Sequence, residues 1–154
     1  MFKIVVDADS CPVKAEVLRV AERFGIKVTL VANQPARSSI MQDWVSEVVV
    51  AGHLDAADDW IVENIEENDI VISADIPLAA RCLKMGGRVL GPKGLVFTER
   101  SIGTALATRD LMTHLRNIGL STRGTAPFEK RDRWRFLQAL DKLVQDTING
   151  RIER

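Results

Sequence analysis

The sequence predicts an α/β fold: a three-layer sandwich around a central, mainly parallel sheet, with additional helices toward the C-terminus. Short apolar, β-branched runs alternate with amphipathic segments over residues 3–90, which is the pattern of parallel β-α-β units. After Gly91 the remaining apolar residues recur at helical spacing. The length of 154 residues suits one domain (1–154), which we divide into an α/β core (1–98) and a helical C-terminal extension (99–154).

Each expected element carries a local signal. Pro12 favours a helix start and Gly25 a helix stop, and Gly86 with Gly87 ends a later helix in the same way. Apolar residues repeat along the last helix from Phe136 to Ile148, so one of its faces should dock on the core. In chain order, strands are expected at 3–7, 26–31, 45–50, 69–73, 88–90 and, at an edge, 95–98. Helices are expected at 12–25, 55–67, 77–86, 103–117 and 131–149.

The composition excludes some classes of protein. No stretch of eighteen apolar residues exists, so the sequence predicts no membrane span. The chain enters a strand at once without a basic leader, so we expect no export and a cytoplasmic location. Cys11 and Cys82 lie far apart without CxxC spacing, which fits a reducing cytosol and no zinc site.

A net charge of zero hides two halves of opposite sign. Residues 1–75 contain fourteen acidic and six basic side chains, whereas residues 76–154 contain seven acidic and fifteen basic ones. Such a division suggests a metal-holding centre beside a surface for polyanions. The alternative is that the two halves simply neutralise each other by packing together.

Six aspartates stand where predicted strands end or where the following helix begins. Parallel strands joined by right-handed crossovers finish at the same edge of the sheet, where ligands of α/β folds bind. Carboxylates gathered there would repel one another, and a hard divalent cation would offset that repulsion. The six residues are Asp7, Asp9, Asp55, Asp58, Asp59 and Asp75.

Each of these acids also has a structural explanation. Asp55 could cap a helix, with Asp58 and Asp59 favourable in its first turn, and Asp75 could cap the helix that Pro77 opens. Acids at three strand-end positions together favour a function for Asp7, Asp9 and Asp75. Helical spacing would also place residues 55, 58 and 59 on one side of their helix.

Long segments of the chain resemble the YaiI/YqxD family of uncharacterised bacterial proteins. The resemblance rests on segments spread over almost the whole chain: DADSCPV at 7–13, DAAD at 55–58, DIVISADIPLA at 69–79, ATRDL at 107–111 and the tract 127–136.

The expected architecture is also similar to the PIN-like superfamily, whose members are mostly metal-dependent ribonucleases. That resemblance implies that Asp7 corresponds to the acid ending the first strand and Asp75 to the acid after the fourth. One of Asp55, Asp58 and Asp59 would take the middle position. It further implies hydrolysis of a phosphodiester in RNA, with Mg²⁺ or Mn²⁺ as cofactor.

On this interpretation the catalytic residues are Asp7, Asp9 and Asp75, and all six aspartates are candidate metal ligands. Basic and polar side chains are expected to contact the phosphates of RNA or another nucleic acid, and Trp134 could stack on a base. The candidate substrate-binding residues are Ser10, Lys14, Ser73, Arg81, Arg109, Arg131 and Arg133.

Two other functions remain open at this point. One is a catalytically inactive PIN-like module that binds RNA or a protein partner through its basic helices. The other is a phosphatase similar to the haloacid dehalogenases, in which Asp7 would be the nucleophile and Asp9 the acid. That second class would need a Ser or Thr after the second strand, and none is clear.

Overall fold

The computed structural model describes residues 1–35, 42–53, 55–119 and 127–150, and it confirms the α/β fold class. Within these residues, six strands form one sheet in the order β3-β2-β1-β4-β5-β6. Neighbours pair in parallel up to β5, and β6 pairs antiparallel with β5. The strands are β1 (Ile4–Asp7), β2 (Val28–Ala32), β3 (Val45–Val49), β4 (Ile70–Ile72), β5 (Arg88–Leu90) and β6 (Val96–Phe97).

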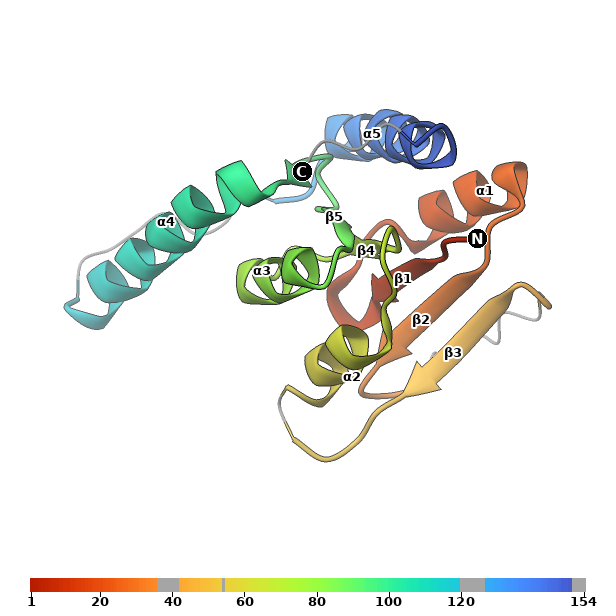
Figure 1. Cartoon of the computed structure of the whole chain (residues 1–154). Helices are drawn as coiled ribbons and strands as arrows, with labels where there is room; N and C mark the ends of the chain where they lie inside the picture. Colours follow the sequence, from red (N-terminus) through yellow and green to blue (C-terminus); the bar gives the residue numbers. More distant parts are fainter. Residues whose placement is uncertain (36–41, 54, 120–126, 151–154) are drawn as a thin grey trace.

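Helices cover both faces of this sheet, as a three-layer sandwich requires. In Figure 1, α1 and α5 lie on one side of the strands and α2 and α3 on the other. No described helix combines the length and the apolar character that crossing a membrane requires. The helices are the 3₁₀ turn η1 (Ala8–Ser10), α1 (Lys14–Phe24), α2 (Ala56–Asn64), α3 (Ile76–Lys84), α4 (Glu99–Asn117) and α5 (Lys130–Ile148).

The central strand β1 is buried on both faces, which explains its unbroken apolar run. Ile4 and Val6 belong to the hydrophobic cluster that also contains Leu140 of α5. Val5 belongs to the cluster on the opposite face, together with Ile61 of α2. The last helix therefore docks on the core, as its apolar repeat predicted.

The strand order places a switch point beside β1. The chain builds β2 and β3 on one side of β1 and then crosses to β4 on the other side. In open α/β sheets the crevice for a ligand lies outside the carboxyl ends of the strands at such a point. Asp7 ends β1, and Ser73 directly follows β4, so both stand at this crevice.

Three features of the fold differ from the expectation, and the first is that the helix expected at 55–67 ends at Asn64. The helix expected from residue 103 begins at Glu99, because Thr98 and Ser101 form a capping box in which each side chain accepts a hydrogen bond from the other's backbone N–H. The turn η1 after β1 was not predicted. None of the nineteen residues of α4 is buried, and Figure 1 shows this helix extending away from the sheet.

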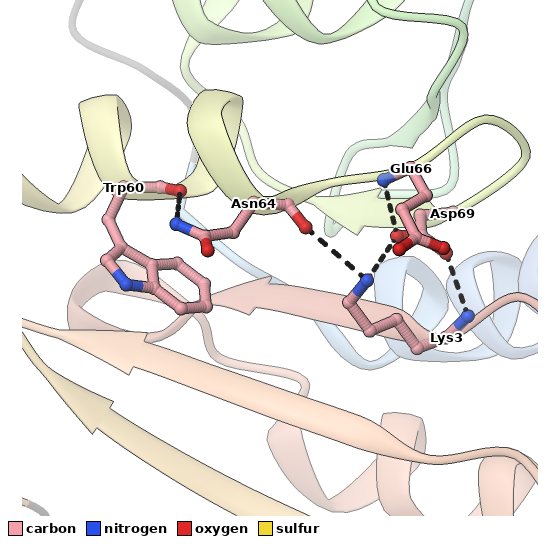
Figure 2. Close-up of polar contacts among 5 residues, drawn as sticks. All are labelled: Lys3, Trp60, Asn64, Glu66 and Asp69. Carbon is pink, nitrogen blue, oxygen red and sulfur yellow. Dashed lines mark hydrogen bonds and ion pairs between the residues drawn. The ribbon is translucent and has the colours of Figure 1, made fainter.

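A buried carboxylate ties β1 to β4 at the amino ends of these strands (Figure 2). Asp69 is 2% exposed and accepts hydrogen bonds from the backbone N–H of Lys3 at 3.0 Å and from that of Glu66 at 2.8 Å. Its Oδ2 also accepts from Lys3 Nζ at 2.5 Å. The three bonds compensate for burying the charge.

Replacing Asp69 with alanine should destabilise the protein by about 2–3 kcal/mol, because three donors lose their acceptor and one of them is charged. Urea unfolding followed by circular dichroism measures the change. Asp110→Ala is the matched control, since that side chain is 77% exposed in a long ion pair, and it should leave stability unchanged. Equal midpoints for the two variants would contradict this assignment.

Candidate functional site

The hydroxyl of Ser73 connects two of the predicted acids at the switch point. Ser73 Oγ donates a hydrogen bond to Asp7 Oδ2 at 3.0 Å and accepts one from the backbone N–H of Asp75, also at 3.0 Å. Ser73 itself is only 4% exposed, so it stands beneath the two carboxylates rather than on the surface. The acids of β1 and of the segment after β4 are thereby held as a pair, with Asp7 half-buried and Asp75 exposed.

Asp75 also has the structural role considered for it. Its Oδ1 accepts a hydrogen bond from the backbone N–H of Leu78 at 3.0 Å, which caps the first turn of α3. Pro77 follows within that turn, where it has no need of a hydrogen-bond donor. The capping bond involves only Oδ1, so the structural role and a functional one are compatible.

Asp58 of α2 is the third member of this group. Burial, followed by the charges of Asp75, Asp7 and Asp55, raises the pKa of Asp58 from 3.8 to about 6, against a lowering effect of Arg81. The pKa of Asp7 is raised as well, first by burial and then by the charges of Asp75 and Asp9, while the Ser73 hydrogen bond lowers it. Three carboxyl groups from three elements therefore act on one another.

The remaining predicted acids lie around this group in different ways. Asp9, in η1, is exposed and accepts a hydrogen bond from the backbone N–H of Asn33 at 2.8 Å. Asp55 occupies the N-cap position of α2, yet its side chain makes no capping hydrogen bond. Asp59 pairs with Arg81 at 2.9 Å and lies 3.8 Å from His53. Asp58 and Asp59 thus differ in partner although they are neighbours on one helix.

The carboxylates do not form a closed cage. In the part of the chain that the structure describes, no three or more His, Cys, Asp or Glu side chains come together closely enough to hold a metal ion. Mg²⁺ is commonly held by one or two carboxylates together with its own waters and the phosphate of a substrate. Asp7 and Asp75, joined through Ser73, fit that sparser arrangement.

The polar residues predicted to bind substrate separate into several environments. Ser73 is buried beneath the carboxylates, and Arg81 is held by Asp59. Lys14 is half-buried at the start of α1. The side chain of Ser10 lies outside the part of the chain that is described.

The described basic residues of the C-terminal helices have different partners and lie on two helices. Arg131 pairs with Glu129 at 2.8 Å. Arg133 joins α5 to α1 by donating to the carbonyl of Pro12 at 2.8 Å and to Glu16 at 2.9 Å. Trp134 beside it is 64% exposed. Arg109 is on the separate helix α4.

Sequence reasoning missed the cavity that Arg109 lines. This space lies between α4, the segment after β4 and the loop that joins β5 to β6. The sequence pattern did not indicate it, because its walls come from three separate segments of the chain. The apolar run at 95–97 and the apolar residues of α4 were the available signals, and periodicity alone assigns such residues to a core.

A family model described as "Uncharacterized BCR, YaiI/YqxD family" matches residues 5–146 of the chain. A UPF0178 protein from Rhodospirillum centenum is 51% identical over 98% of this chain and 100% of its own length. A UPF0178 protein from Mesorhizobium japonicum is 54% identical over 96% of this chain and 94% of its own.

Among solved structures, the chain is similar to a homospermidine synthase from Legionella pneumophila in complex with NAD. The TM-score is 0.50 at 16% identity, and the similarity covers 80% of this chain and 35% of the synthase. At this identity the likeness concerns the fold alone.

Asp58→Asn should stabilise the metal-free protein at pH 7.5 by about 1 kcal/mol, after allowance for solvent screening, and should have no effect near pH 4. The folded pKa of about 6 lies above the ordinary 3.8, so the folded state binds the proton more tightly and loses stability as the pH rises through this interval. Urea unfolding in EDTA across pH 4–8 measures this change in the free energy of unfolding.

Asp59→Asn is the matched control for that experiment, because it removes the neighbouring charge from a pair with Arg81. It should give no gain in stability at pH 7.5. A gain that is equal for both variants, or constant from pH 4 to pH 8, would contradict the assignment.

Proposed function

Because the chain belongs to the YaiI/YqxD family, whose name assigns no activity, we propose its function from the site itself. The proposal is that the carboxylates of Asp7 and Asp75 bind a divalent cation, Mg²⁺ or Mn²⁺, with the charge of Asp58 acting on them, and promote hydrolysis of a phosphodiester in RNA. The free thiols of Cys11 and Cys82 agree with the cytoplasm as the place of this reaction.

The observation that carries this proposal is the bridge formed by Ser73. Its hydroxyl binds Asp7 Oδ2 and the backbone of Asp75, so two acids distant in sequence stand together at the crevice of the fold. A protein gains no stability by gathering like charges, and such an arrangement is typical of a site that binds a cation. The carboxylate of Asp58, on α2, interacts electrostatically with both of these acids.

The chain's own residues would position the reaction. Ser73 fixes one oxygen of Asp7, and the cap of α3 fixes one oxygen of Asp75, so both carboxylates are oriented before a ligand arrives. When bound, the cation would supply Lewis acidity that stabilises negative charge developing on the phosphoryl oxygens. Asp58 ionises near neutral pH, so cation binding should strengthen above about pH 6.

The distribution of charge along the sequence supports RNA as the proposed substrate class. The site-bearing half of the chain is acidic, and the other half, residues 76–154, has an excess of basic side chains. A phosphodiester bound to a cation at the crevice could extend toward α4, where Arg109 stands.

The two alternative functions, a phosphatase and a binding module without catalysis, differ in the residues or the behaviour that they require. A phosphatase of the haloacid-dehalogenase type would need a hydroxyl side chain after β2, where the chain has Asn33, Gln34 and Pro35. A binding module without catalysis would retain RNA binding after loss of the aspartates.

Asp7→Asn and Asp75→Asn should each weaken Mn²⁺ binding at least tenfold and reduce RNA cleavage by about 100-fold. Asparagine retains the helix cap at position 75, so this variant removes charge while the fold is preserved. Isothermal titration with Mn²⁺ gives the affinity. Cleavage of labelled single-stranded RNA in Mn²⁺, Mg²⁺ or EDTA gives the activity.

Asp59→Asn is again the matched control and should bind Mn²⁺ and cleave RNA like the parent. Equal activity of the parent and the Asp7 and Asp75 variants would indicate a contaminating nuclease and refute the proposal. RNA binding that persists in these variants, with no cleavage by the parent, would select the binding module. A covalent fluoroberyllate adduct on Asp7 would select the phosphatase.

A further inference from the structure

An apolar cavity of about 510 Å³ lies beside the segment that carries Asp75. Ala74 and Ile76, the two neighbours of Asp75 in the chain, both line it. The opposite wall belongs to α4, and the floor includes Phe97 of β6. The cavity and the carboxylate site therefore share the segment that leads from β4 into α3.

The walls of the cavity combine apolar side chains with cationic ones. Most lining residues are apolar or small, and the cations of Arg109 and Lys93 stand among them. Pockets for small organic ligands have this composition and a volume of roughly 300–1,000 Å³. A ligand suited to these walls has a flat, weakly polar body and an anionic group.

The position of α4 explains why the cavity is open. This helix packs against α3 near its beginning, through Ile102 and Ala105, and has no buried residue farther along. Met112 lines the cavity and is still 40% exposed. The helix thus forms one wall that a ligand can reach.

We propose that this cavity receives the unpaired base of a nucleotide whose phosphate lies at the Asp7–Asp75 edge, which makes single-stranded RNA the substrate. This inference rests on the proposed function and deepens it. The base would contact Ile76, Phe97 and Met112, and Arg109 would pair with a phosphate or stack on the base.

Charge favours a nucleotide over a wholly apolar occupant. A second copy of the chain or an apolar peptide would bury Arg109, whose pair with Asp110 is long at 4.0 Å, against carbon, whereas a nucleotide supplies an anion beside an apolar base. A base-paired strand could not place its base in the cavity without leaving the stack, so unpaired RNA is favoured.

The test compares adenosine monophosphate with ribose 5-phosphate, which lacks the base. Isothermal titration of the full chain should show at least about tenfold tighter binding of the nucleotide, both in Mn²⁺ and in EDTA. Ala105→Phe fills the cavity from α4 and should abolish this preference while leaving the affinity for ribose 5-phosphate unchanged. Ala107→Phe, on the exposed side of the same helix, is the matched control and should retain the preference.

A second pair of variants tests the cavity without adding bulk. Arg109→Gln should weaken nucleotide binding at least fivefold, whereas Arg116→Gln, outside the cavity, should not. Circular dichroism and sedimentation velocity establish that every variant is folded and report its oligomeric state.

Equal affinity for the two probes in the parent would overturn the inference, as would identical behaviour of Ala105→Phe and Ala107→Phe. A parent dimer that Ala105→Phe converts to monomer would identify a second copy as the occupant and would overturn it too. RNA cleavage with no base preference would leave the proposed function standing without this inference. A base preference lost in Ala105→Phe, with no Mn²⁺ binding, would support the cavity and refute the metal reaction.

Discussion

The central place of β1, tied to β4 by a side-chain bridge at each end, is the constraint on which this structure depends. At the amino end, buried Asp69 holds the backbone and the amine of Lys3. At the carboxyl end, Ser73 holds Asp7. The first bridge joins opposite charges and stabilises the fold, whereas the second gathers like charges next to it. The amino ends of β1 and β4 are therefore stabilised by an ion pair. At their carboxyl ends, where a ligand is expected, like charges repel one another.

That division explains how the chain tolerates repulsion at the crevice. Burial of β1 on both faces supplies apolar stabilisation that does not depend on the acids, because Ile4, Val5 and Val6 are fully buried. The carboxylates stand at the edge of this core, where water still reaches Asp75 and screens part of their interaction. Burying these carboxylates more deeply would increase their desolvation free energy. Full exposure would leave their side chains without a fixed orientation.

Sequence reasoning recovered the features set by local periodicity and missed those set by contacts across the fold. The buried strands and the docking of the last helix followed from apolar spacing, and the convergence of Asp7 and Asp75 followed from the handedness of parallel crossovers. The early start of α4 was missed because Thr98 and Ser101 are an atypical capping pair. The different partners of Asp58 and Asp59 depend on Arg81 of another helix, which no spacing rule locates. Arg133, predicted to contact phosphates, also joins α5 to α1, a contact that no spacing rule indicates.

The residues of the turn after β1 decide which groups the crevice presents to a ligand. In dinucleotide-binding folds the turn after the first strand offers glycine and free backbone N–H groups to a pyrophosphate. Here the corresponding residues are Asp7, Ala8 and Asp9, followed at position 12 by a proline, which has no N–H. Two carboxylates at that turn repel an anion unless a cation lies between them. Binding of a phosphate at this turn would therefore depend on the cation that we propose.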